Sequence, residues 1–305
     1  MLSKFVLATI VYYDTLEYPM TAFEAWKHLL IPDGVTNIPK ASLRAVEQTL
    51  ESLQSRGSVE ENFGFWALPC REGLVLDRIQ REKRAVEKIK RAVKLIRRCS
   101  WIPFVRMIAL TGSLSMKQGD RSSDWDLLVA MKSGAIWTGR FLLTFWLTAL
   151  GQRRHGQHIT DRACLNCYLA DSSLEVPLKD VFSSHEYRFM YPVVGEETFR
   201  SFELVNRWMA RYRPHFSPTV VSPLFLVSPK RWMRVLQTAL EQLFVHRWLE
   251  KYLRRYQKQR IERNPKTQIP GGFILVSDEA LVFLPEPKGP KVFDRFKESL
   301  SQNSL

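Results

Sequence analysis

Cysteine is scarce in this chain, and long apolar runs are missing from it. Four cysteines among 305 residues are too few for a disulfide scaffold, which favours a reducing, cytoplasmic location. The most apolar stretch, residues 141–150, has about half the length that a membrane-spanning helix needs. The first residues lack a basic segment followed by a small-residue cleavage site, so we expect neither a secretory signal nor a membrane partner.

Internal repeats and low-complexity tracts are also missing, and 45% of the residues are hydrophobic. A chain of this length and composition can bury two or three compact units. Acidic residues are the minority charge, because 31 Asp and Glu stand against 45 Lys and Arg, a net charge of +14. This excess favours a polyanionic partner such as nucleic acid or a nucleotide.

Residues 1–72 have the pattern of a winged-helix-like domain. Thr21 and Glu24 form a capping box ahead of one short helix, helical spacing of leucines and a valine predicts another before residue 57, and residues 59–68 predict a β-hairpin. The segment holds six Lys and Arg against nine Asp and Glu, a net charge of −3. A DNA-reading domain normally carries a positive field, so we expect a packing domain or a domain that contacts a protein partner.

Residues 73–100 are expected to form a basic connecting helix. Apolar side chains recur along one face between residues 79 and 96, and ten Lys and Arg with two Glu lie from Arg78 to Arg98. This segment therefore carries +8 of the net charge. Two interpretations stay open: a solvated helix face, or a surface at residues 78–98 for nucleic acid or another polyanion.

After Pro103 the sequence changes to short apolar runs, which predict an α+β fold. The expected strands and one buried helix cover residues 105–110, 127–131, 164–170 and 137–150. Helical patterns follow, and a Pro- and Gly-rich segment closes the chain. We therefore divide this part of the chain into a central unit, a helical domain and a strand and loop tail, at residues 101–185, 186–265 and 266–305.

The strongest chemical signal lies between the first two of these strands. Gly112 and Ser113 form a turn after the first strand, and Asp124 and Asp126 open the second one after a gap of ten residues. Alternate residues of a strand share a face, so both carboxylates point the same way. Neighbouring carboxylates repel unless a cation lies between them, and Mg²⁺ accepts carboxylates together with phosphate oxygens. Gly112 lets a phosphate approach the backbone, Ser113 can donate to it, and Lys117 can neutralise part of a triphosphate, which indicates metal-assisted phosphoryl or nucleotidyl transfer.

The stretches Thr111–Ser113 (TGS) and Ser123–Val129 (SDWDLLV) resemble the motif of the nucleotidyltransferase superfamily, whose members have a DNA polymerase β-like palm. The stretches DTLEYPMTAFEAWKHL, WIPFVRMIALTGSL and QKQRIERNPKT also look like bacterial nucleotidyltransferase-domain proteins with an amino-terminal winged helix. This resemblance implies a palm at 101–185, nucleotide contacts from the Gly-Ser turn and Ser123, and a two-ion Mg²⁺ site on the Asp pair. The implied reaction moves a nucleoside monophosphate from a nucleoside triphosphate, with ATP expected, to a hydroxyl acceptor and releases pyrophosphate.

The sequence departs from this family at the third carboxylate of the site. Asn166 occupies the corresponding position on the third strand, and an amide cannot accept a proton at neutral pH. Asp161, just before that strand, and Asp171, just after it, are the acids that could substitute. The alternative function is a non-catalytic regulator that binds nucleic acid or protein and keeps a degenerate nucleotidyltransferase domain.

Four possible zinc ligands, His155, His158, Cys164 and Cys167, lie close together in the sequence. On a regular strand the two cysteines would face opposite sides of the sheet. We therefore expect buried core thiols and no zinc site.

Aromatic residues at helical positions alternate with basic residues late in the chain: Trp208, Trp232, Trp248, Tyr252 and Tyr256. Between Arg247 and Arg263 there are seven basic residues and two glutamates. Aromatics in such a setting can stack on nucleobases, but core packing is the interpretation that we favour for them.

Overall fold

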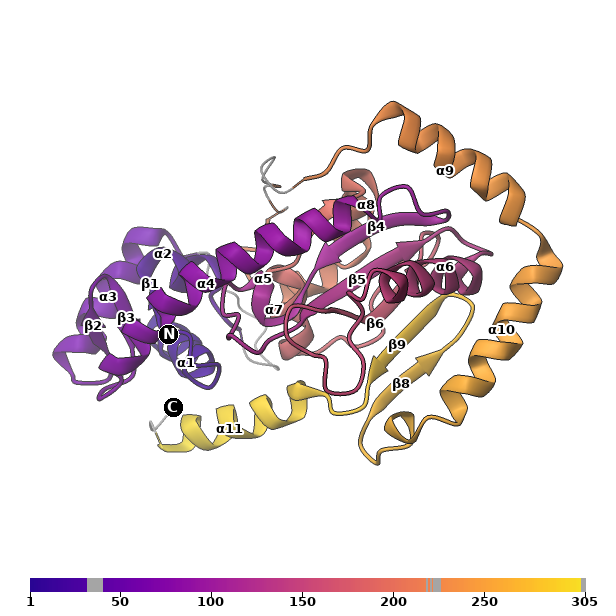
Figure 1. Cartoon of the computed structure of the whole chain (residues 1–305). Coiled ribbons are helices and arrows are strands. Elements are labelled where there is room, and N and C mark those ends of the chain that lie inside the picture. The colour runs from indigo at the N-terminus through magenta and orange to yellow at the C-terminus, as the bar shows by residue number, and fades with distance from the viewer. Residues whose placement is uncertain (32–40, 218, 220, 222–225, 303–305) are drawn as a thin grey trace.

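The computed structural model of the chain describes residues 1–31, 41–217, 219, 221 and 226–302 (Figure 1). Helices and strands are mixed along the chain, so the expected α+β class is confirmed. A small helical unit with a three-stranded sheet lies at one end of the molecule, and a six-stranded sheet flanked by helices lies at the other. Every helix in the described ranges falls short of the length or the apolarity that crossing a bilayer requires.

The N-terminal unit contains the short helices and the hairpin that its sequence predicts. Its elements are α1 (Leu2–Asp14), α2 (Ala22–Lys27), α3 (Leu43–Ser55), β1 (Met20–Thr21), β2 (Glu60–Asn62) and β3 (Phe65–Ala67). The expected capping box is confirmed, because the Thr21 N–H donates to Glu24 Oε2 (2.9 Å) and the Glu24 N–H donates to Thr21 Oγ1 (3.2 Å). Strand β1 pairs with β3, which adds a third strand to the hairpin.

The core of this N-terminal unit continues into the rest of the molecule. The Tyr13 hydroxyl lies 3.1 Å from Nδ1 of His185 on α7 (Val181–Arg188). The ring of His28 stacks on Phe189, with the ring centroids 4.4 Å apart. These buried contacts hold the N-terminal unit in a fixed position against the helix that follows the third central strand.

The basic helix α4 (Glu72–Arg97) runs from the N-terminal unit to the large sheet (Figure 1). Its residues Ile89, Val93 and Ile96 are buried against that sheet, as the apolar pattern predicts. Two of the ten cations between Arg78 and Arg98 are buried and do not lie on a solvated face. Arg78 is buried in an ion pair with Glu24 (2.6 Å), and the buried Lys88 donates to backbone and side-chain oxygens of the following unit. The basic surface of this helix is therefore smaller than its sequence suggests.

The large sheet has the strand order β7-β4-β5-β6-β9-β8, in which β5 and β6 are parallel and the other pairs are antiparallel. Its strands are β4 (Val105–Leu110), β5 (Trp125–Met131), β6 (Ala163–Ala170), β7 (Tyr191–Val194), β8 (Phe273–Val276) and β9 (Ala280–Leu284). The three strands expected from the apolar runs are confirmed to within two residues at each end. They occupy the middle of the sheet and position the candidate site.

Helices cover both faces of this sheet. One face packs on α4, α6 (Ile136–Ala149) and α10 (Arg247–Glu262), and the other packs on α7 and α8 (Glu196–Val205). The remaining helical segments are α5 (Gly112–Ser115), α9 (Arg231–Phe244), α11 (Lys288–Gln302) and the 3₁₀ turns η1 (Arg207–Arg211) and η2 (Pro265–Thr267). In Figure 1, α9 and α10 form the outer edge of the molecule beside the sheet.

The predicted division of the C-terminal half was wrong in two places. The segment 186–265 is not wholly helical, because β7 interrupts it and pairs with β4 at the sheet edge. The tail 266–305 is more than strands and loops, because α11 follows β9 and returns to the N-terminal unit. There Phe296 packs against Tyr12 with the ring centroids 5.3 Å apart. In both places packing against distant parts of the chain determines the secondary structure, and the local sequence pattern carries no information about such packing.

The expected core packing of the late aromatic residues was also wrong for four of the five. Trp232, Trp248, Tyr252 and Tyr256 are exposed on α9 and α10, and only Trp208 packs partly buried against the core. The face of α10 that does pack inward carries Leu253, Gln257 and Ile261.

Candidate functional site

The Gly-Ser turn after β4 lies directly against the start of β5. The Thr111 N–H donates to the backbone oxygen of Asp126 (2.9 Å), which fixes the turn beside that strand. Gly112 has φ +67°, and a Cβ on it would overlap Asp126 Oδ2 and lie 3.1 Å from Asp126 Cγ. Both its backbone conformation and its surroundings therefore require glycine at this position.

The two predicted aspartates converge at the opening of β5, while Trp125 between them is buried in the core on the other face. Carboxylate oxygens of Asp124 and Asp126 and the Cys164 sulfur all lie within 4.8 Å of one another. Arg154 Nη1 donates to Asp124 Oδ2 (2.6 Å). Asn166 Nδ2 donates to Asp126 Oδ1 (3.0 Å). The alternation that the sequence predicts is thus realised, and this group could hold a metal ion.

The chemistry of these donors suits a hard cation. Burial raises the pKa of the Asp126 carboxyl to about 6, and the neighbouring charge of Asp124 adds to the rise. Burial, together with the charges of Asp126 and Asp124, also raises the pKa of the Cys164 thiol to about 12, so the sulfur stays protonated at neutral pH. Two crowded carboxylates offer the oxygen ligands that Mg²⁺ prefers.

A β-bulge at Asn166 shapes the third central strand. Leu127 pairs with Leu165 and Leu128 pairs with Cys167, so Asn166 is an extra residue in the parallel ladder. The bulge places Cys164 and Cys167 on the same face of the sheet, and the expectation of opposite faces was wrong for that reason. Cys167 nevertheless lies in the hydrophobic core, as predicted. In the part of the chain that the structure describes, the metal-binding group contains neither Cys167 nor the two histidines of the possible zinc motif.

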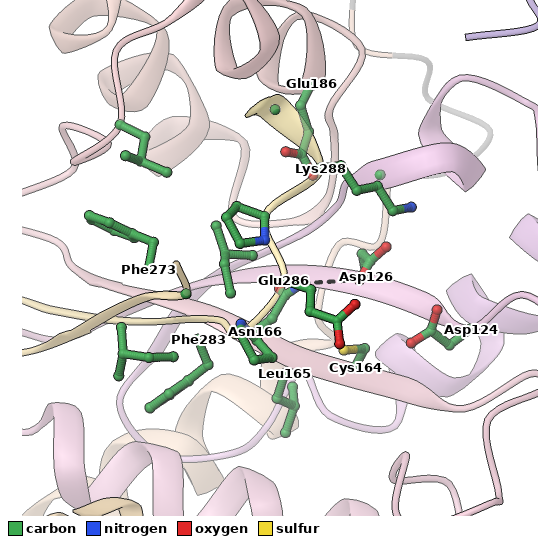
Figure 2. Close-up of a pocket in the computed structure, with 18 of the residues that line it drawn as sticks. Asp124, Asp126, Cys164, Leu165, Asn166, Glu186, Phe273, Phe283, Glu286 and Lys288 are labelled. Carbon is green, nitrogen blue, oxygen red and sulfur yellow. Dashed lines mark hydrogen bonds between the residues drawn. The ribbon is translucent and has the colours of Figure 1, made fainter. Parts of the chain in front are cut away.

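The Asp pair lines a cavity of about 1090 Å³ that also contains Gly112, Ser113 and Arg154. Its other walls come from segments far away in sequence. Phe273 of β8 and Phe283 of β9 line the cavity from opposite faces of the sheet, the link after β9 contributes Glu286, and the start of α11 contributes Lys288 (Figure 2).

Two acids in this cavity were not predicted from the sequence. Glu186 of α7 lines the cavity and is partly buried, and this burial, followed by the charge of Asp126, raises its pKa to about 7. Glu286, on the segment after β9, is exposed and also lines the cavity (Figure 2). Both come from segments outside the motif. The sequence signal that could have indicated Glu286 was the charged Glu-Pro-Lys stretch after a predicted strand, and Glu186 had no comparable signal.

Three predicted site residues lie outside the cavity. Lys117 Nζ pairs with Glu82 on α4 (2.6 Å). Lys88, also on α4, donates to the carbonyl (2.8 Å) and hydroxyl (3.2 Å) of Ser123. Asp161 pairs with Lys88 (3.1 Å) and with Arg91. The basic helix engages all three, so the structure places Lys117, Ser123 and Asp161 against α4 and not in the wall of the cavity. Asp171, the other acid considered, lies near Arg106 (3.8 Å) and does not line the cavity.

Comparison of the chain with models of known protein families, with curated proteins and with solved structures gives no match. The functional conclusion therefore depends on the geometry of the site.

Proposed function

We propose that this chain is an Mg²⁺-dependent nucleotidyltransferase with a polymerase β-like palm, which moves a nucleoside monophosphate from a nucleoside triphosphate to a hydroxyl and releases pyrophosphate. The observation that carries the proposal is the convergence of Asp124 and Asp126 beside the Gly112–Ser113 turn in one cavity. ATP is the triphosphate that we expect first.

The Asp pair would hold Mg²⁺, which when bound offsets the charge of the triphosphate and polarises its phosphorus. The chain's own groups supply the remaining contacts. The Ser113 hydroxyl and the backbone at Gly112 can donate to phosphate oxygens, and Arg154 and Lys288 place positive charge in the same cavity. Phe273, on the same face of the sheet as the Asp pair, provides a flat apolar surface on which a base can stack (Figure 2).

Glu186 is the group that we assign as the proton acceptor in place of the missing third carboxylate. Asn166 is engaged as a hydrogen-bond donor to Asp126 and holds that carboxylate in position. A carboxylate with a pKa near 7 is well matched to general base catalysis at neutral pH. The acceptor oxygen forms a bond to the α-phosphorus, the bond from that phosphorus to the pyrophosphate oxygen breaks, and the hydroxyl proton passes to Glu186.

Incubation of the protein with each α-labelled nucleoside triphosphate and Mg²⁺ tests this function. The label should appear on an acceptor when the protein itself, RNA and a cell lysate are offered in turn. Asp126→Asn should abolish both label transfer and Mg²⁺-dependent nucleotide binding, because it removes one of the two carboxylates. A wild-type protein that neither transfers label nor binds any triphosphate in the presence of Mg²⁺ would refute the proposal.

A second function is favoured by one observation, the amide at position 166 that bonds to Asp126. Under this alternative the chain binds a nucleotide without turnover and regulates another molecule through its N-terminal unit. Equilibrium binding of Mg²⁺ and ATP to the wild-type protein, with no label transfer to any acceptor, would identify this case.

A further inference from the structure

Helix α10 carries a line of exposed aromatic side chains. Trp248, Tyr252 and Tyr256 are four residues apart, so they lie on one side of the helix over about 12 Å. Their exposed fractions are 68%, 63% and 45%. Because the opposite side of α10 already packs against α6 and the sheet, the helix has no need of these aromatics for its own packing. We call these three residues the aromatic stripe.

The aromatic stripe ends at a cluster of arginines. The next residue at the same spacing is Arg260, whose Nη1 donates to the Tyr256 hydroxyl (3.3 Å). Arg260 lines a small pocket of about 100 Å³ together with Arg140 and Arg153. Among the described residues, the other side chains around this pocket are neutral. Three guanidinium groups around one pocket form a site for an anion, since phosphate oxygens accept hydrogen bonds from such groups.

Arg140 shows that this cluster is short of negative charge. Burial lowers its pKa, and repulsion from Arg153 and Arg260 lowers it further. Its Nη1 donates to Gln257 Oε1 (2.5 Å), but its Nε is buried and has no partner within the described part of the chain. The nearby acids Glu250 and Asp278 are already engaged, the first with backbone N–H groups of α6 and the second with Arg254 (2.7 Å).

The arginine pocket opens toward the candidate active site. Arg140, Arg153, Ile261 and Asn264 line both the small pocket and the large cavity that holds the Asp pair. The arginine pocket is therefore continuous with the large cavity, whose lining includes residues of both faces of the sheet: the arginines on the α10 face and the Asp pair on the other. Figure 1 shows α10 on the outer edge of the molecule, where a long ligand can lie along it.

We propose that α10 binds a single-stranded nucleic acid that serves as the acceptor of the nucleotide. Its bases stack on the aromatic stripe, a backbone phosphate sits in the arginine pocket, and its terminal hydroxyl enters the large cavity. The identity of the acceptor depends on the proposed transferase function, whereas strand binding by α10 can be measured without it. The exposed face of α10 favours a nucleic acid over a protein or a lipid surface, because between residues 247 and 260 it presents aromatic, polar and basic side chains and no exposed aliphatic one.

Fluorescence anisotropy with labelled 12-nucleotide RNA and DNA single strands tests this site in the full-length protein. The double variant Trp248→Ala/Tyr252→Ala should weaken binding about 100-fold, since stacking on each aromatic residue contributes about 10-fold. The double variant Arg153→Gln/Arg260→Gln should weaken binding and reduce the slope of log affinity against log salt by about 0.7, because the pocket holds one phosphate and about 0.7 is lost per phosphate contact of a single strand.

Matched controls separate this site from the rest of the basic surface. Trp232→Ala removes an exposed tryptophan on the neighbouring helix α9, and Lys83→Gln/Lys94→Gln removes two exposed cations on α4. Both controls should bind the strands within about twofold of the wild type, since neither residue set touches the aromatic stripe. If the α4 variant loses binding and the α10 variants keep it, the proposal is wrong.

The outcomes also separate this proposal from the transferase proposal. If the Asp126→Asn variant still binds the strand but no longer transfers label to it, the result supports both the strand site on α10 and the transferase function. Strand binding to α10 without any transfer by the wild type leaves α10 as a nucleic-acid site and removes the transferase function. If the protein transfers label to another acceptor and binds no strand, the site on α10 is overturned. It is also overturned if the protein self-associates or binds anionic vesicles and the Trp248→Ala/Tyr252→Ala variant abolishes that association or binding.

Discussion

Replacing Gly112 by alanine should damage the metal site more than the fold. The added Cβ overlaps Asp126 Oδ2, and the nearest atoms belong to a side chain and not to the backbone. A carboxylate can rotate away from such a clash, whereas a strand cannot. The expected result is a folded protein in which Asp126 has left its hydrogen bond with Asn166 and can no longer bind a metal ion together with Asp124.

The size of the effect follows from two contributions. A left-handed backbone conformation costs a non-glycine residue about 1–2 kcal/mol. Loss of the hydrogen bond between Asn166 and the Asp126 carboxylate adds about 1.5–3 kcal/mol. Gly151→Ala is the matched control, because Gly151 has a nearly equal φ of +63° and open space where its Cβ would lie. The control should lose only the first contribution, so the two variants should differ by about 1.5–3 kcal/mol in the free energy of unfolding.

Urea denaturation of both variants measures this difference, and calorimetric titration with Mg²⁺ and ATP measures the effect on the site. Gly112→Ala should lose Mg²⁺-dependent ATP binding by at least about tenfold, corresponding to 1.4 kcal/mol, while Gly151→Ala binds as the wild type does. Equal losses of stability in the two variants, with ATP binding intact in both, would show that the contact between Gly112 and Asp126 has no role in the site.

Three further predictions address the charged groups of the protein. Because the pKa of Asp126 is raised from 3.8 to about 6, the folded state binds more protons than the unfolded state between these values, and stability falls as the pH rises through them. Asp126→Asn should therefore raise the free energy of unfolding at pH 7 by about 3 kcal/mol, at 1.36 kcal/mol per unit. The gain should shrink toward pH 4 in urea titrations, and a gain independent of pH contradicts the assignment. Glu186→Gln should lower kcat about 100-fold with little change in the KM for the triphosphate, and Glu286→Gln should lower it less than tenfold; the reverse order in steady-state kinetics would make Glu286 the base. Arg78→Ala should destabilise the protein by about 3 kcal/mol in urea denaturation, because it leaves the carboxylate of Glu24 without its buried partner, and a loss below about 1 kcal/mol would show that the pair is not needed.

The central strands could be predicted because each is a run of apolar residues with clear local boundaries. Val105–Leu110 is found as expected, since Pro103 precedes it and the Gly-Ser turn ends it. Strand β7 could not be predicted, because Tyr191–Val194 is four residues long and its pairing partner β4 lies more than 80 residues earlier. Which face of α10 is buried could not be predicted either. The spacing of its aromatic residues shows that they share one face, but not whether other parts of the chain cover that face.

The candidate site was predictable to the extent that it is local. Asp124 and Asp126 share a face through the alternation of a strand, and Gly112 meets them because β4 and β5 are neighbours. Ser123 and Asp161 are close to these residues in sequence, but in the structure they turn toward Lys88 on α4. Glu186 reaches the cavity from α7, which lies 60 residues beyond the Asp pair, so no spacing within the motif could indicate it.

The return of α11 to the N-terminal unit has a consequence for the order in which this protein can fold. Val292 and Phe296 belong to the same hydrophobic core as Phe5 and Tyr12 of α1, although about 280 residues separate them in the sequence. A ribosome therefore releases α1 long before the side chains that complete its surroundings have been synthesised. Contacts of such high sequence separation slow folding and leave apolar surface open for longer. The first core to leave the ribosome is thus among the last to close, and until then its exposed side chains are available to chaperones.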